Sequence, residues 1–302
     1  MKGGEGGQAE DRAARVGRAA IASAICDRIQ VAAGAAARYI RARAPEIAEL
    51  EWETKSPADF VSEVDVGAEG IVRELLMEDT LWVGGLDESL PVRVVGEEGT
   101  PDLALAGDGI TYVVDPLDGT TNFLHGYPWY AVSIGALLDG ELLAGVVLNA
   151  ATDEEFVATA GGGATRNGRS IRVASNADPS RALIGTGFPF KNVSRLDEYQ
   201  RQFAAITKPT AGIRRAGAAA LDLCDVACGR FDAFWELNLA PWDVAAGILI
   251  VREAGGVVTD LEGRDARVGS GPIVAGSPAM HSWLLRVLGN SGSDPQGLGA
   301  RG

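Results

Sequence analysis

Residues 115–123 read Asp-Pro-Leu-Asp-Gly-Thr-Thr-Asn-Phe and directly follow the mainly apolar run 110–114, Ile-Thr-Tyr-Val-Val. A short apolar, β-branched run predicts a buried strand. Such a strand would deliver Asp115 to the C-terminal edge of a sheet, where open α/β sheets bind their ligands. Pro116 has no N–H for the ladder, so we expect the strand to end there and a turn to bring Asp118 back beside Asp115. The stretch therefore predicts an α/β fold with an acidic site at one sheet edge.

The chemistry of this edge suits a phosphate ester. Asp115 and Asp118 offer hard oxygen ligands to a divalent cation, and Mg2+ is favoured because the stretch contains neither His nor Cys. Gly119 lets the main chain approach an anion without a Cβ, and the N–H groups of Gly119 and Thr120 can seat a phosphate. The alternative is an ordinary Asp-rich turn in which Asp118 or Thr120 caps a helix.

Two other acidic clusters stand at the ends of predicted elements. Gly96-Glu97-Glu98-Gly99 follows the β-branched run 92–95, and Asp243 precedes the small, apolar segment 244–250, which is typical of a buried helix. Taken alone, Glu97 and Glu98 also fit a solvated turn, and Asp243 fits a simple helix N-cap. Together with 115–118, the clusters predict one metal centre built from distant parts of the chain.

The chain resembles the inositol monophosphatase family, whose members are Mg2+-dependent, lithium-sensitive phosphomonoesterases within the fructose-1,6-bisphosphatase-like superfamily. The resemblance extends from about residue 21 to about residue 288 and implies a five-layer αβαβα sandwich of two lobes and a homodimer. It rests on these motifs: GEE (96–98), DPLDGTTNF (115–123), WDVAAG (242–247), KSPADFVSEVD (55–65), GGGATRNGRSIRVA (161–174), GTGFPFK (185–191) and RRAGAAALDLCDVACGRFDAFWE (214–236).

The resemblance also implies a ligand set for the metals. Glu97, Asp115 and the backbone carbonyl of Leu117 would hold one Mg2+, and Asp115, Asp118 and Asp243 would hold a second. A third, looser ion would lie near Glu97. Mn2+ is the expected substitute for Mg2+, and Li+ is the expected inhibitor.

The remaining implied roles concern water and phosphate. Thr120 and Glu97 would orient the attacking water, with Asp65 supporting the threonine. Gly119 and Thr120 would give main-chain N–H groups to the phosphate. Lys55 would lie near the metals.

The expected substrate contacts come from the second half of the chain. The resemblance implies that Glu236 accepts hydrogen bonds from substrate hydroxyls. Arg214 and Arg215 are candidates to touch the substrate, although helix packing or a subunit contact explains them equally well. Ala240 stands where several relatives carry His or Lys, so we expect a more open or less polar rim.

The chemistry needs no covalent nucleophile. Two cations about 3.5–4 Å apart can activate a water, neutralise phosphoryl oxygens and shield the leaving oxygen. The chain has only two histidines, His125 and His281, which is poor material for a Ser-His-Asp relay. We expect His125 in a structural turn and His281 on the surface of the last amphipathic helix.

Composition narrows the class of protein further. The 302 residues are 46% hydrophobic, enough for two compact lobes with full cores. The formal charge of −14 argues against nucleic acid as the main ligand, since phosphate neutralisation needs clustered Lys and Arg. We expect no membrane span and no secretory signal. The three cysteines form no even framework and no CxxC pair, so the reducing cytoplasm is the expected location.

Hydrophobic periodicity and turn residues organise the chain into two lobes. We expect residues 13–174 to form an α+β lobe with two N-terminal helices and a sheet rich in antiparallel strands. Residues 175–289 are expected to form an α/β lobe that carries Asp243 and the substrate pocket. Residues 1–12 and 290–302 are expected to be disordered.

Three functional hypotheses follow. The first is hydrolysis of a small polyol or sugar phosphate, best represented by inositol 1-phosphate. The second is a sibling phosphatase acting on histidinol phosphate, fructose 1,6-bisphosphate or 3′-phosphoadenosine 5′-phosphate. The third, of another class, is a catalytically silent binding or regulatory protein. Such a protein would be expected to have lost one of the metal ligands, whereas this chain retains all of them.

Overall fold

The computed structural model describes residues 5–50, 52–56, 59–77, 90–100, 105, 107–189 and 193–291, without the side chains of 5–16, 49, 52, 54–56, 59, 60 and 291. In this part of the chain the α-helices are α1 (Glu5–Arg43), α2 (Glu63–Met77), α3 (Thr120–Leu124), α4 (Leu196–Thr207), α5 (Ala219–Ala227), α6 (Pro241–Glu253) and α7 (Pro278–Ser291). Short 3-10 helices lie at Ala44–Glu49, Pro179–Arg181 and Val193–Arg195.

Seven strands form the larger sheet, in the order β3-β4-β5-β6-β7-β8-β9. Only β3 and β4 run parallel, and the other neighbours pair antiparallel, as the predicted antiparallel-rich sheet requires. The strands are β3 (Val92–Gly96), β4 (Ile110–Asp118), β5 (Ala131–Leu138), β6 (Glu141–Asn149), β7 (Glu154–Thr159), β8 (Gly163–Arg166) and β9 (Arg169–Ser170). A separate hairpin pairs β1 (Trp52–Ser56) with β2 (Asp59–Ser62).

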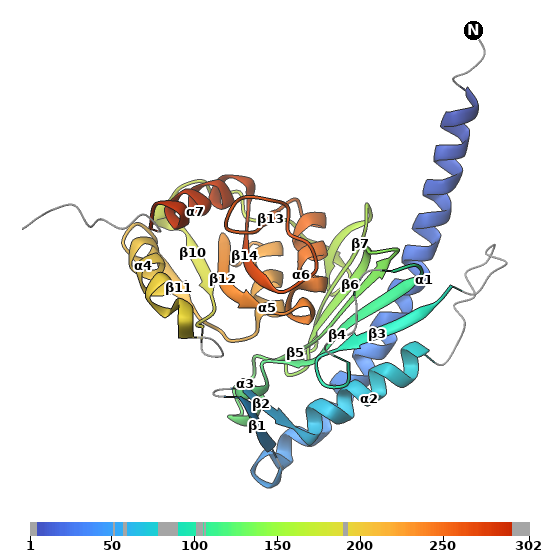
Figure 1. Ribbon diagram of the computed structural model, residues 1–302, viewed down its shortest axis with the longest axis horizontal. Helices are drawn as coiled ribbons and strands as arrows, with labels where there is room; N and C mark the ends of the chain where they lie inside the picture. The colour runs from blue at the N-terminus through green and yellow to red at the C-terminus, as the bar shows by residue number, and fades with distance from the viewer. Residues whose placement is uncertain are drawn as a thin grey trace, which may run out of the picture.

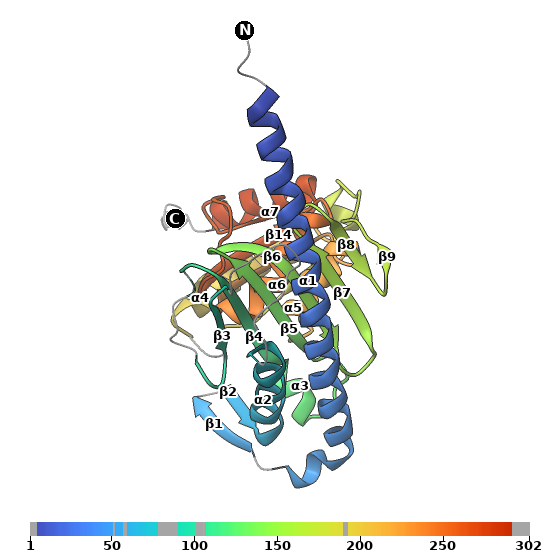
Figure 2. The ribbon, with the colours of Figure 1, turned by 90° about the vertical axis from the view of Figure 1, so that its right-hand side faces the viewer.

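The second sheet has five strands in the order β11-β10-β12-β14-β13. Its strands are β10 (Leu183–Thr186), β11 (Gly212–Arg214), β12 (Ala233–Leu239), β13 (Val257–Thr259) and β14 (Gly271–Gly276). Figure 1 shows α5 and α6 between the two sheets, with α4 and α7 on the far face of the smaller one. Figure 2 shows α1 and α2 on the outer face of the larger sheet. The predicted five-layer αβαβα sandwich is confirmed.

Small residues allow α6 to lie directly on the larger sheet. A Cβ added at Gly135 of β5 would lie 2.6 Å from Ala245 Cβ, and one at Gly145 of β6 would lie 3.0 Å from Ala246 Cα. The helix is buried over 244–251, so its apolar residues face both neighbouring layers. This close approach fixes the position of the first turn of α6, which carries Asp243.

Helix α1 is longer than the sequence predicts. It begins at Glu5, so residues 5–12, expected to be disordered, are helical, whereas 1–4 and 292–302 lie outside the described residues. By length and composition alone, the helical segment Gly17–Ala48 is long and apolar enough to cross a membrane. A core helix passes the same test, and this one packs on β6 and α2 through buried residues such as Ile25 and Ile29.

Two other expectations differ from the structure. Strand β4 does not end before Pro116 but continues to Asp118. His281 is not on the surface: its side chain is buried, with Nε2 2.9 Å from Thr259 Oγ1. The helix that carries it packs on β13 and β14, and His281 lies on the side that meets Thr259 of β13.

Candidate active site

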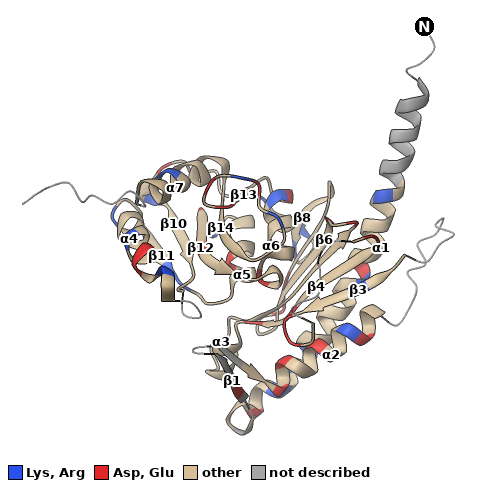
Figure 3. Cartoon of the chain, in the orientation of Figure 1, with Lys and Arg blue, Asp and Glu red and all other residues tan. Residues whose placement is uncertain are grey.

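Parallel pairing of β3 and β4 brings Glu97 next to Asp115. Gly96, the last residue of β3, pairs with Val114 of β4, and the N–H of Glu97 donates to the carbonyl of Val114 at 3.3 Å. The carboxyl ends of parallel strands meet at one sheet edge, so Glu97 follows the end of β3 beside Asp115, where β4 loses its pairing with β3 and continues along β5. Figure 3 shows acidic stretches between α2, α3 and the adjacent end of this sheet.

A β-bulge places Asp118. Between Asp115, paired with Ser133, and Asp118, paired with Ala131, β4 has one residue more than β5. A bulge tolerates the proline that an ordinary ladder would reject, and it re-aims the side chains that follow. Asp118 Oδ2 accepts the N–H of Ala220 in α5 at 2.8 Å, and Asp115 Oδ1 accepts the N–H of Leu117 at 3.0 Å.

Asp243 comes from the other half of the chain. It is the third residue of α6, so it is not the N-cap expected from the sequence; that position is Ala240, whose N–H donates to Asp243 Oδ2 at 2.7 Å. The charge of Asp243 also raises the pKa of Asp115 and Asp118, so the carboxylate lies near both. One side chain therefore both bonds the N-cap residue and contributes to the acidic cluster.

The cluster is strongly repulsive. Asp115 is 1% exposed, and burial, followed by the charges of Glu97, Asp118 and Asp243, raises its pKa well above the ordinary range. Burial, followed by the charge of Asp243, raises the pKa of Asp118 to about 8. A bound cation is the usual way to hold such a set of carboxylates ionised in one place.

The donor set fits a hard divalent cation. The side chains near Asp115 offer carboxylate oxygens, which is the chemistry of Mg2+ rather than of zinc or copper. Within the described ranges, however, no three His, Cys, Asp or Glu side chains are drawn together closely enough to enclose an ion. The described residues thus supply oxygen donors of the right kind, without a closed coordination shell.

Thr120 and Asp65 form a hydrogen-bonded pair beside the cluster. Thr120 Oγ1 donates to Asp65 Oδ1 at 2.8 Å and lies 3.1 Å from the Leu117 carbonyl. Asp65 is held by Ser62, whose N–H and hydroxyl donate to Oδ2 at 2.8 and 2.6 Å. Burial raises the pKa of Asp65, and the bonds from Ser62 and Thr120 oppose that rise. The pair fixes the threonine hydroxyl at the edge where the acidic residues meet.

Gly119 has a backbone that an L side chain would strain. Its φ is +93°, and a Cβ there would lie 3.0 Å from the Trp129 carbonyl and 3.3 Å from Ala218 Cβ. The turn from β4 into α3 therefore requires glycine at this position, both for its positive φ and for the limited space.

The predicted substrate residues fall into different places. Glu236 is half-buried on β12, and a Cβ added at Gly187 would overlap its carboxylate. Arg214 is exposed and bonds back to the carbonyl of Ile213 at 3.0 Å. Arg215 instead lies over the ring of Phe188, 5.4 Å from its centroid. For Lys55, the structure gives its place in β1, while its side chain lies outside the described residues.

Two buried acidic residues near the cluster escaped the sequence analysis. Glu69 lies one helical turn after Asp65 on α2, a spacing of four that puts both on one face. Asp222 on α5 is 1% exposed, and burial followed by the charge of Glu236 raises its pKa well above the ordinary range. The signal that could have identified both residues is a carboxylate at a helix position where the hydrophobic period predicts a side chain that faces the core.

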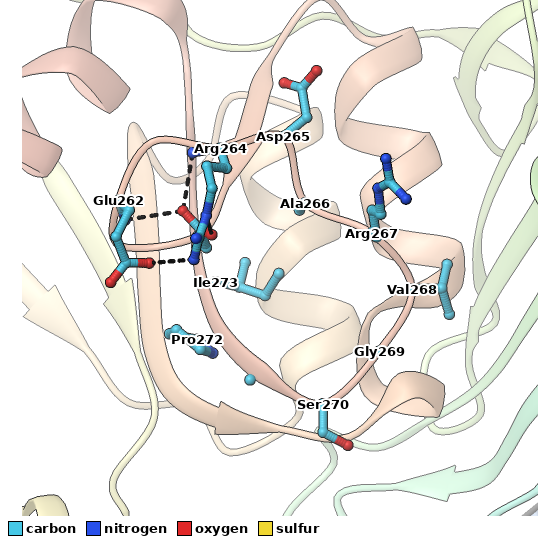
Figure 4. Close-up of a pocket in the computed structure, with 12 residues that line it drawn as sticks. Glu262, Arg264, Asp265, Ala266, Arg267, Val268, Gly269, Ser270, Pro272 and Ile273 are labelled. Atoms are coloured by element: carbon cyan, nitrogen blue, oxygen red, sulfur yellow. Dashed lines mark hydrogen bonds and ion pairs between the residues drawn. The ribbon is translucent and has the colours of Figure 1, made fainter.

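A surface pocket lies elsewhere. Its volume is about 550 Å3 and it is lined by the loop 260–273, with none of the predicted site residues among its lining. Figure 4 shows Arg264 turned toward Glu262 within this loop, where its guanidinium also bonds Asp260. The pocket is therefore a hollow formed by a single loop, which is held in shape by its own ion pairs.

A model of the inositol monophosphatase family matches residues 21–293. The chain belongs to the inositol monophosphatase family. Its relatives include "Nus factor SuhB" of Pseudomonas aeruginosa, 45% identical over 239 residues, 78% of this chain and 84% of that protein. "Inositol-1-monophosphatase" of Rhizobium meliloti is 44% identical over 243 residues, 80% of this chain and 88% of that protein.

A solved structure supports the same assignment. The "extragenic suppressor protein suhB" of Bartonella henselae is 38% identical, with a TM-score of 0.78 over 88% of this chain and 98% of that one. Membership makes the protein a phosphatase of a family that is generally metal-dependent. The names of the relatives differ, so they leave the substrate to be argued from the site.

Proposed function

We propose that the protein hydrolyses the phosphate monoester of a small polyol, best represented by inositol 1-phosphate, with Mg2+ held by Glu97, Asp115, Asp118, Asp243 and the Leu117 carbonyl. The observation that carries the proposal is the raised pKa of Asp115, caused by burial and by the three neighbouring carboxylates. Support comes from the charges of Glu97, Asp118 and Asp243, which all act on Asp115, and from membership of a phosphatase family.

The chain's own residues would orient the reaction. When bound, the cations would supply a water of lowered pKa and would neutralise charge on the phosphoryl and leaving oxygens. Thr120 donates its hydroxyl hydrogen to Asp65, so the lone pairs of Oγ1 are left to accept a hydrogen from the attacking water. Glu97 would accept the other hydrogen. The N–H groups of Gly119 and Thr120 would hold the phosphate in line with that water.

Polyol selectivity rests on Glu236. A carboxylate accepts hydrogen bonds and repels further anionic groups, so a half-buried carboxylate favours a substrate that presents hydroxyls there. Asp222 is buried close enough to Glu236 for the charge of Glu236 to raise its pKa. A second phosphate, as in fructose 1,6-bisphosphate or 3′-phosphoadenosine 5′-phosphate, would lie against the Glu236 carboxylate and be repelled by it. Arg215 is the cation near this carboxylate and Asp222.

The test is a substrate panel. Phosphate release from inositol 1-phosphate is compared with release from histidinol phosphate, fructose 1,6-bisphosphate and 3′-phosphoadenosine 5′-phosphate, with Mg2+ titrated and Li+ added. We expect inositol 1-phosphate to be the best substrate. A rate on inositol 1-phosphate below about a tenth of the best one would overturn the substrate assignment.

Asp115→Asn tests the metal site. The amide lacks the negative charge that would hold the cations, so we expect turnover to fall at least about 1,000-fold, whereas the metal-free fold persists because a repulsive buried carboxylate has been removed. Circular dichroism checks the fold, and phosphate release checks turnover. Near-normal turnover in a folded variant would show that Asp115 is not a metal ligand.

A binding role besides catalysis is the second candidate, because the Pseudomonas relative is named a Nus factor. The sequence retains Glu97, Asp115, Asp118, Thr120 and Asp243, so catalysis is the primary proposal. A role independent of catalysis would survive in the Asp115→Asn variant. The homodimer, the cytoplasmic location and Li+ inhibition stay predictions.

A further inference from the structure

Glu69 makes an unusual set of contacts with the turn that carries Glu97. Its side chain is 3% exposed on α2. Oε2 accepts the N–H of Glu98 at 2.8 Å, and Oε1 accepts the N–H of Gly99 at 2.9 Å. Arg73, one turn further along the helix, donates to Oε1 at 3.0 Å. Glu69 is therefore a buried carboxylate satisfied mainly by two consecutive backbone N–H groups.

The turn is shaped around this carboxylate. A Cβ added at Gly96 or Gly99 would lie 2.5 Å from Glu69 Oε1. Thr100 fastens the same turn, because its hydroxyl accepts the N–H of Gly96 at 3.2 Å and donates to the carbonyl of Val94 at 2.8 Å. The residues on both sides of Glu97 are thus held through their backbone, and the glycines leave the space that the carboxylate fills.

We propose that Glu69 is a positioning residue that fixes the Glu97 turn and thereby sets the metal affinity of the site. The inference rests on the proposed function, in which Glu97 is a metal ligand. Asp65 and Glu69 lie one turn apart on α2, so a single helical face orients two parts of the site. Asp65 orients the Thr120 hydroxyl, and Glu69 orients the carboxylate of Glu97.

Charge explains why a carboxylate is needed. An ionised carboxylate accepts from both N–H groups at once, and hydrogen bonds to a charged group are about twice as strong as neutral ones. An amide of the same shape keeps one acceptor but turns an NH2 group toward the other N–H. Glu69→Gln would therefore loosen one side of the turn without opening a cavity. Replacing a residue that orients a metal ligand typically costs about 10–100-fold in metal affinity.

The experiment compares Glu69→Gln with Glu74→Gln, a matched control at an exposed position of the same helix. Two readouts are taken: the Mg2+ concentration that gives half-maximal phosphate release, and direct Mg2+ binding by calorimetry. We expect Glu69→Gln to weaken Mg2+ binding about 10–100-fold in both, with kcat at saturating Mg2+ changed less than threefold. The control should match the wild type.

The outcomes separate this inference from the proposed function. Unchanged Mg2+ affinity in a folded Glu69→Gln variant, with normal Mg2+ dependence in the wild type, would overturn the inference alone. A wild type that neither binds nor needs Mg2+ would overturn the proposed function and this inference with it. Should Glu69→Gln fail to fold, Thr100→Val removes the other fastening of the turn. Weaker Mg2+ binding in that variant would support the inference, and unchanged binding would overturn it.

Discussion

Gly135→Ala tests whether the contact between α6 and the larger sheet positions Asp243. Gly135 is buried on β5 beneath Ala245. The new Cβ would lie 2.6 Å from Ala245 Cβ and 3.0 Å from Ala245 C. Carbon atoms in contact prefer about 3.5–4.0 Å, so the helix or the strand must move by roughly 1 Å.

Both stability and activity should respond to this movement. Adding a methyl group to a packed core costs about 1–3 kcal/mol. Asp243 lies two residues before Ala245 on the same rigid helix and should move with it. A displacement of about 1 Å at a catalytic group can cost on the order of 100-fold in rate, so we expect a comparable loss of kcat/KM.

Urea unfolding and phosphate release measure the two effects. Gly70→Ala is the control, because a Cβ at this helical position meets nothing within 4 Å and should stabilise α2 by about 0.5–1 kcal/mol. Ala245→Gly removes the methyl group that the new Cβ would strike. In the double variant we expect activity to recover in part, because the backbone contact with Ala245 C at 3.0 Å remains, and the two substitutions to couple by at least about 1 kcal/mol.

Two results would contradict this reasoning. Wild-type stability and activity in Gly135→Ala would show that the contact between β5 and α6 accommodates an added methyl group without moving Asp243. A loss that Ala245→Gly does not repair would place the cause elsewhere, for example in the backbone of β5.

Two further predictions concern other sites. Burial lowers the pKa of His281 in the folded chain. Below its ordinary pKa of about 6.5, this imidazole therefore binds a proton more readily in the unfolded chain than in the folded one. Stability should therefore fall as pH drops from 7.5 to 5.5, and urea unfolding should show a shallower fall in His281→Gln; equal slopes would contradict this. Gly187→Ala should displace Glu236 and lower kcat/KM for inositol 1-phosphate about 10–100-fold, with little effect on p-nitrophenyl phosphate, which has no polyol. An equal loss on both esters would show that the substitution damages the metal site instead.

Local sequence patterns explain why much of the acidic edge of the larger sheet could be predicted. An apolar run followed by Asp115 and Asp118 encodes a strand and its end within a few residues, and the parallel partner β3 carries the same pattern before Glu97. The bulge was not predicted, because a proline reads as a strand end unless the partner's register is known. Strand β11 is only three residues long and β14 begins with Gly-Pro, so neither shows the alternation of apolar and polar residues that identifies a strand in a sequence.

Residues whose partners are distant backbone groups were beyond sequence reasoning. Glu69 bonds to N–H groups 29 and 30 positions away, and nothing in its own neighbourhood announces them. His281 was placed on the surface because a polar residue in an amphipathic helix usually faces water. Its burial against Thr259 depends on how α7 is rotated on its sheet, which is a property of the packed molecule.

The central position of α6 also decides how the chain can be divided. This helix follows the expected lobe boundary near residue 174 by more than sixty positions, yet it packs on β4, β5, β6 and β7 as well as on α5. A fragment cut at that boundary would leave one face of the larger sheet bare and would carry no Asp243. We therefore expect the two halves to behave as a single cooperative folding unit, so that split or permuted versions regain activity only when both pieces reassemble around this shared helix.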